Sequence, residues 1–119
     1  MTHKGRDRHG IDLLEQAATE LREALAPQLG GDARYQALLA ASAVATAARA
    51  ARAAPHLDRT VDVLAGVDVA AIRAGAHDTD VTLHRHLRAQ AALCAWVADP
   101  RSLTATEAAD HLPEDLHDT

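Results

Sequence analysis

Residues 33–54 read ARYQALLAASAVATAARAARAA, and this stretch decides the fold. Alanine has the highest helix propensity of all residues and the smallest apolar side chain. Asp32 is a good N-cap and Pro55 interrupts regular helix, so we predict one long helix from Ala33 to Ala54. Small side chains cover most of its circumference, which predicts a central helix with neighbours on several sides.

The rest of the composition agrees with a small helical domain. The chain has 119 residues, of which 48% are apolar, and Phe is absent. Trp96 and Tyr35 are the only aromatic residues. A core of Ala and Leu buries little area per residue, at about 25 cal/mol per Å². Its helices must therefore approach closely, and a partner subunit would increase the apolar area that is buried.

A first helix is predicted from about residue 10. Asp12 and Glu15 have the spacing of a capping box. Pro27 and the glycine pair at 30–31 end the helix. Its apolar residues recur at three- and four-residue steps and share one face: Ile11, Leu14, Ala18, Leu21 and Leu25.

The last strong helix is predicted from Val81 to about Ala98. Thr79 or Asp80 can cap its start, and Asp99-Pro100 ends it. We expect Leu83 and Trp96 beside its main apolar stripe, and Cys94 as a packed core thiol. That stripe consists of Val81, Leu87, Ala91, Cys94 and Val97.

Residues 56–78 permit two interpretations. Alternating valines between Val61 and Val69 fit a strand. A lone hairpin would have no sheet to join, so we favour helices, one ending at Gly66 and one over Val69–Arg73. The predicted fold is therefore all-α, a small bundle of three main helices plus one or two short ones. We expect residues 1–9 to be disordered, 10–101 to form the domain, and 102–119 to be an acidic, mostly disordered tail.

Charge and composition exclude several classes of protein. The net charge of −5 argues against nucleic acid as a partner, because phosphate binding needs a basic patch. The single cysteine excludes an internal disulfide and fits a reducing cytoplasm. The weakly polar run from Tyr35 to Ala48 is shorter than the roughly 20 residues that span a bilayer. We expect a cytoplasmic protein that is not bound to a membrane.

Candidate site residues are few, and none pairs a nucleophile with a base. His77, His84 and His86, near Asp78 and Asp80, suggest a metal site, but His84 and His86 point to different sides of a helix. We therefore expect no metal and no cofactor. Arginine suits phosphate because its guanidinium donates two parallel hydrogen bonds. The candidate binding residues are Arg34, Tyr35, Arg73, His84 and Arg88.

The order of several segments resembles a bacterial family of unknown function. Its members lie beside, or are fused to, aminoglycoside-phosphotransferase-like kinases, near acyl-CoA dehydrogenases. Where the family carries an arginine-rich stretch with asparagine, this chain has residues 40–45, AASAVA. The matching segments span about residues 11–101: Asp12–Glu15, Pro27–Gly30, Arg34-Tyr35, Ile72–Gly75 with Asp78, Leu83–Ala89 and Asp99–Arg101.

Three functions follow as hypotheses. The resemblance implies a non-catalytic accessory protein that binds a phosphotransferase-like kinase, or a second copy of itself, in acyl-CoA or related metabolism. The arginines suggest an alternative, a protein that binds acyl-CoA or phosphate. The third hypothesis is a metal-dependent enzyme built on residues 77–86. We favour the first, because no catalytic set is present.

Overall fold

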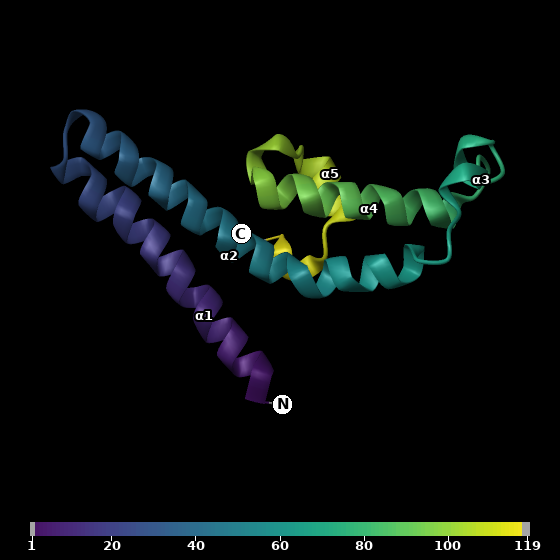
Figure 1. The fold of residues 1–119 in the computed structure, drawn as a ribbon, viewed down its shortest axis with the longest axis horizontal. Helices are drawn as coiled ribbons and strands as arrows, with labels where there is room; N and C mark the ends of the chain where they lie inside the picture. Colours follow the sequence, from purple (N-terminus) through teal and green to yellow (C-terminus); the bar gives the residue numbers. More distant parts are fainter. Residues whose placement is uncertain (1, 118–119) are drawn as a thin grey trace. The chain divides into compact units, whose positions relative to one another are not determined.

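The computed structural model describes residues 2–117, with side chains from Arg8 onward. It divides into two compact units, residues 1–52 (unit 1) and 53–119 (unit 2). Every regular element in the described part is helical, which confirms the all-α prediction (Figure 1). Three helices are long and two are short. The α-helices are α1 (Thr2–Thr19), α2 (Gly31–Leu64), α3 (Val69–Arg73), α4 (Val81–Ala98) and α5 (Ala105–His111).

The prediction that the helix ends before Pro55 is wrong, because α2 continues to Leu64. A proline inside a helix removes one hydrogen bond and crowds the preceding turn, at a cost of about 3 kcal/mol. The helix continues because residues after Arg52 have a place to pack: Ala53 is fully buried and Leu57 packs against the same core. The predicted short helix ending near Gly66 is thus the end of α2. No strand forms here.

Helix α1 begins at Thr2, earlier than the start predicted near residue 10; Met1 lies outside the described residues. Residues 2–9 contain no proline, so the helix can extend back through them. The predicted capping box is wrong, because Asp12 and Glu15 lie in the middle of the helix. Glu15 instead accepts a hydrogen bond from Arg52 Nε at 2.5 Å.

A change of helical pitch follows α1. A π-helix, η1 (Glu20–Leu25), leads into a 3₁₀ turn, η2 (Ala26–Gln28). The wider π turn takes in one more residue and shifts the side-chain register. As a result Ala26 is buried while Leu25, expected on the packed face, is 45% exposed. The remainder of the predicted face is correct: Ala18 is buried, and Ile11, Leu14 and Leu21 are half-buried.

Unit 2 has a core of bulky side chains. Leu93 and Trp96 of α4 lie against Ala53 of α2 and against two leucines near the C-terminus, Leu112 and Leu116. Helix α4 has the predicted bounds, with Asp80 as N-cap, and α3 also matches its prediction. The predicted α4 stripe is correct only at Val97, which packs against the core, and Leu83 and Trp96 beside it are buried as expected. The other buried residues of α4 are Ala92 and Leu93, while Val81, Leu87 and Cys94 are exposed.

The segment expected to be a mostly disordered tail is folded as far as residue 117. It contains η3 (Pro100–Ser102), α5 and η4 (Glu114–Leu116). Thr104 and Glu107 form a complete capping box at the start of α5. Leu112 and Leu116, only 8% and 1% exposed, then bury their side chains beside Trp96. This apolar contact also explains why α4 turns Trp96 inward. Residues 118–119 lie outside the described residues.

Candidate functional site

The hairpin of unit 1 buries only alanines. The chain runs along α1, turns near Gly30 and returns along the first part of α2 (Figure 1). Small side chains allow two helix backbones to approach closely, but each alanine removes little apolar area from water. No large apolar side chain is buried among the described residues of this unit. Its buried residues are Ala18, Ala26, Ala37, Ala41 and Ala48.

The remaining surface of this part of α2 carries no charge. Between Arg34 and Arg49 the helix has no acidic or basic residue. At 100° per residue, its exposed apolar and hydroxyl side chains cover an arc of about 200°. A helix that is apolar nearly all round is normally covered by neighbours. We call these residues the uncharged face: Tyr35, Leu38, Leu39, Ala40, Ser42, Ala43 and Ala47.

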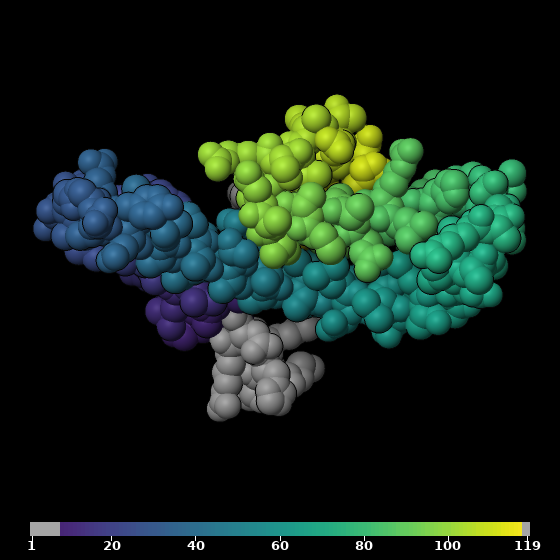
Figure 2. All heavy atoms as spheres, turned by 45° about the horizontal axis from the view of Figure 1, so that its top comes forward, coloured from purple at the N-terminus to yellow at the C-terminus, as the bar shows by residue number. Residues whose placement is uncertain are grey.

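The large side chains of the uncharged face are open to water. Tyr35 is 64% exposed, Leu39 is 52% and Leu38 is 37%. Figure 2 shows this part of the chain in blue, and Leu25 precedes it with a further exposed apolar side chain. Contiguous exposed apolar surface of this kind is typical of a contact with another molecule.

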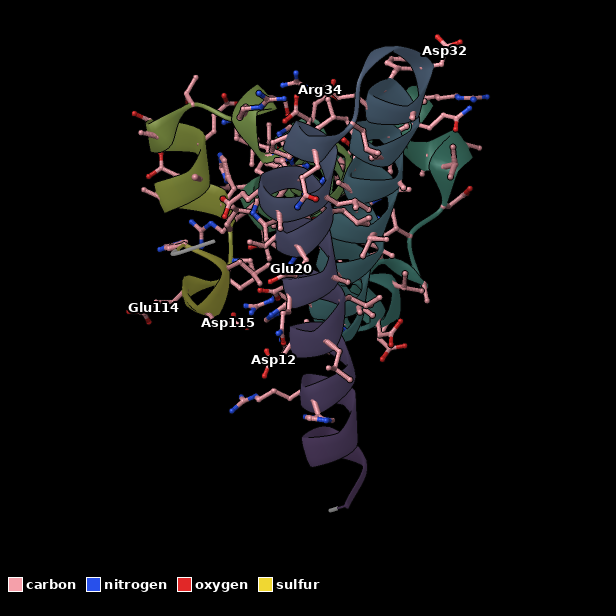
Figure 3. The ribbon with its side chains drawn as sticks, turned by 90° about the vertical axis from the view of Figure 1, so that its left-hand side faces the viewer. Asp12, Glu20, Asp32, Arg34, Glu114 and Asp115 are labelled. Atoms are coloured by element: carbon pink, nitrogen blue, oxygen red, sulfur yellow. The ribbon has the colours of Figure 1, made fainter. Side chains whose placement is uncertain are left out.

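The two arms of the hairpin carry opposite charge. Residues 8–28 contain two arginines and four acidic residues, 2 − 4 = −2, and residues 31–52 contain three arginines and one aspartate, 3 − 1 = +2. Asp12 lies on α1 and Glu20 is the first residue of η1, and Asp32 and Arg34 lie at the start of α2 (Figure 3). The Arg52–Glu15 ion pair uses one charge from each arm. Arg34 and Arg49 bracket the uncharged face in the sequence, and charges beside an apolar surface can select its partner.

A shallow groove of about 400 Å³ lies in unit 2. Its apolar floor is made by alanines of α4 and by Leu103. Arg88 has no hydrogen bond or ion pair within residues 8–117, so its guanidinium is available to an anion. Ser102 and Glu107 at the rim already form hydrogen bonds with neighbouring residues. The lining residues are Arg88, Ala91, Ala92, Ala95, Ser102, Leu103, Glu107 and His111.

Those two rim residues serve the local fold. Glu107 Oε1 accepts the backbone N–H of Thr104 at 3.0 Å, and this hydrogen bond lowers the pKa of Glu107. Ser102 Oγ donates to the carbonyl oxygen of Asp99 at 2.7 Å. The groove therefore offers an apolar floor, the free cation Arg88 and an imidazole from His111.

The five predicted binding residues divide between the two units. Arg34 and Tyr35 lie in the first turn of α2 in unit 1. Arg73 ends α3, and His84 and Arg88 lie on α4, all in unit 2. All five are exposed, and Arg88 alone among them lines the groove. The binding role of the five stays a prediction.

The histidine-rich segment has a structural role around the start of α4. Asp80 Oδ1 accepts the backbone N–H of Leu83 at 3.0 Å, and this bond, more than the nearby His77 and His84, lowers the pKa of Asp80. His77 Nδ1 lies 3.5 Å from Asp80 Oδ2. Across the described residues, no three His, Cys, Asp or Glu side chains are grouped to hold a metal ion.

One polar chain was missed by sequence reasoning. Arg59 donates to His56 Nδ1, and His56 Nε2 lies 3.1 Å from Asp115 Oδ1. Three-residue spacing places His56 and Arg59 on one face, but Asp115 belongs to the segment predicted to be disordered. These contacts between Arg59, His56 and Asp115 link η4 to α2.

Comparison with known proteins adds no relative: no family model, no curated protein and no solved structure matches this chain. Among the described helices, none combines the length and apolar character that crossing a bilayer requires.

Proposed function

We propose that this chain is a non-catalytic interaction protein that docks through the uncharged face of α2. The observation that carries the proposal is the contrast within one hairpin. Its buried seam holds alanines, and its largest apolar side chains, Tyr35, Leu38 and Leu39, point to water. Leu38 and Leu39 keep 37% and 52% of their area exposed, and covering them with a partner removes that area from water.

The resemblance described above supplies one candidate partner, a phosphotransferase-like kinase active in acyl-CoA or related small-molecule metabolism. The kinase would supply the catalytic residues, because this chain pairs no nucleophile with a base. A small helical domain commonly offers one helix face to a groove or helix of its partner. The other candidate partner is a second copy of the chain.

Paired charge substitutions test the docking surface. Leu38→Glu with Leu39→Glu places two carboxylates on the uncharged face, and binding of the partner should weaken at least about a hundredfold. The matched control is Val61→Glu with Val63→Glu, because these valines also lie on α2 and are 55% and 52% exposed. Binding is measured by titration calorimetry with the purified kinase and by sedimentation of the chain alone.

The two variants must behave differently if the proposal is right. The face variant should lose association while the control retains it, and both should keep the helical circular dichroism of the parent chain. Equal association by the two variants, or a parent chain that binds neither the kinase nor itself, would overturn the docking function.

A second function is favoured by one observation, the free guanidinium of Arg88 beside the apolar floor of the groove. We propose, as the alternative, that the groove binds a small anion with a short apolar body, such as the phosphate and acyl parts of an acyl-CoA. Titration with acetyl-CoA and with inorganic phosphate tests it. Arg88→Ala should abolish binding, and Arg85→Ala, the exposed control on the same helix, should not.

A further inference from the structure

The partner that covers the uncharged face can be identified from the hairpin itself. We infer that it is a second copy of this chain, with hairpin laid on hairpin and α1 of one copy beside α2 of the other. This inference rests on the docking function proposed above. It specifies the partner, the pairing of the helices and the charges that select that pairing.

The size of the face fits a pair of hairpins. Residues 35–48 of α2 extend over about 20 Å. Leu13 and Leu25 on the other arm add exposed apolar side chains, at 54% and 45%. Two such hairpins would bury on the order of 1,200 Å² in total, which is the lower end of stable interfaces. The result would be four helices around one apolar interior, the arrangement that a single hairpin lacks.

The charges favour a second copy over an unrelated chain. One arm carries −2 and the other +2, so α1 against the partner's α2 brings opposite charges together. Two-fold symmetry makes this contact twice, because α1 of the first copy meets α2 of the second while α2 of the first meets α1 of the second. The alternative, α1 against α1 and α2 against α2, sets like charges side by side and is disfavoured.

Charge reversal gives a test specific to this pairing. Glu20→Lys with Glu23→Lys changes the first arm from −2 to +2, and Arg34→Glu with Arg49→Glu changes the second from +2 to −2. Each variant alone brings like charges together across the interface, so its dimer dissociation constant should rise about tenfold. An equimolar mixture should recover dimers, because the positive arms of one variant then meet the negative arms of the other.

Sedimentation equilibrium of the full chain measures the outcome. The parent chain should approach the dimer mass, 2 × 12.6 = 25.2 kDa. Leu38→Glu with Leu39→Glu should give the monomer, and Val61→Glu with Val63→Glu should remain a dimer. Circular dichroism of every variant separates loss of pairing from loss of the helices.

Two results would overturn the inference, and they differ in what they mean for the docking function. If the parent chain stays monomeric at about 100 µM but needs Leu38 and Leu39 to bind the kinase, the second copy is wrong and the docking function stands. If the parent chain is a dimer that neither the face variant nor the charge reversals weaken, the dimer uses another surface. The inference then fails as well.

Discussion

The two units of this chain use helices in opposite ways. Unit 2 places bulky side chains inside, with Trp96 and Leu93 2% exposed and Leu116 1% exposed. Unit 1 buries alanines and leaves Tyr35 and Leu39 more than half exposed. The difference shows that a helical segment can be as regular as its neighbour and still lack a core of its own. The exposed side chains of unit 1 are the basis of the docking function proposed above.

The largest effect should come from the core of unit 2. Trp96→Ala removes the aromatic side chain of the unit 2 core and should lower the free energy of unfolding by about 3–5 kcal/mol. Tyr35→Ala, the matched truncation of the exposed aromatic in unit 1, should cost less than about 0.5 kcal/mol in the monomer. Urea unfolding followed by circular dichroism compares them, and similar losses would break the contrast between the units.

The C-terminal segment provides the next test. Leu116→Ala should cost about 2–5 kcal/mol, because its side chain is buried against the core that contains Trp96. Leu103→Ala, a half-buried leucine in the same segment, is the control and should cost less. Thermal melts of the three chains measure the difference. A Leu116 variant as stable as the parent would mean that the segment adds nothing to unit 2.

A smaller effect is expected in the hairpin seam. Ala41 is fully buried, so Ala41→Leu forces a larger side chain between two close helices and should cost about 1–3 kcal/mol. Ala43→Leu, on the uncharged face of the same helix, should be tolerated and should strengthen association. Urea unfolding reports the first effect and sedimentation the second. A stabilising Ala41→Leu would show that the helices are not in close contact.

The smallest effect is the pH dependence of two helix starts. The pKa of Glu107 is below its ordinary value of 4.5 because its carboxylate accepts the Thr104 N–H, and that of Asp80 is below 3.8 because it accepts the Leu83 N–H. Their stabilisation is complete above these ordinary values and is lost as the pH falls through the lowered pKa of each group. The helical signal should therefore decline in acid.

Amide variants isolate that decline. Asp80→Asn with Glu107→Gln keeps hydrogen-bonding oxygens at both helix starts but does not titrate. Circular dichroism between pH 7 and pH 2 should show a smaller loss of helix at the acid end for this variant than for the parent chain. An identical loss in both would assign the acid transition to other carboxylates.

Local sequence signals predicted much of the fold. Asp80 and Asp99-Pro100 set the bounds of α4, because caps and breakers act within a few residues. Pro55 misled the prediction because the favourable packing of Ala53 and Leu57 is a tertiary effect. The π turn buries Ala26 in place of Leu25, and the side-chain periodicity of the sequence does not indicate it.

The candidate surfaces were predicted in part. The alanine-rich stretch predicted a helix that needs neighbours, but which side would stay open depended on how α1 packs. The charge of Arg88 made it a candidate binding residue. The groove beside it was not predicted, because residues 102–111, which form one side of it, were predicted to be mostly disordered. Asp115 was missed for the same reason. Leu112 and Leu116 are single leucines among acids, and only Trp96 gives them a core to join.

Hydrogen–deuterium exchange at increasing protein concentration tests the central claim most directly. If the uncharged face is an interface between two copies, amides of residues 35–48 should exchange more slowly as the concentration rises through the dissociation constant. Amides of residues 81–98 should not change, because unit 2 has its own core. Exchange over residues 35–48 that is the same at every concentration would contradict the account.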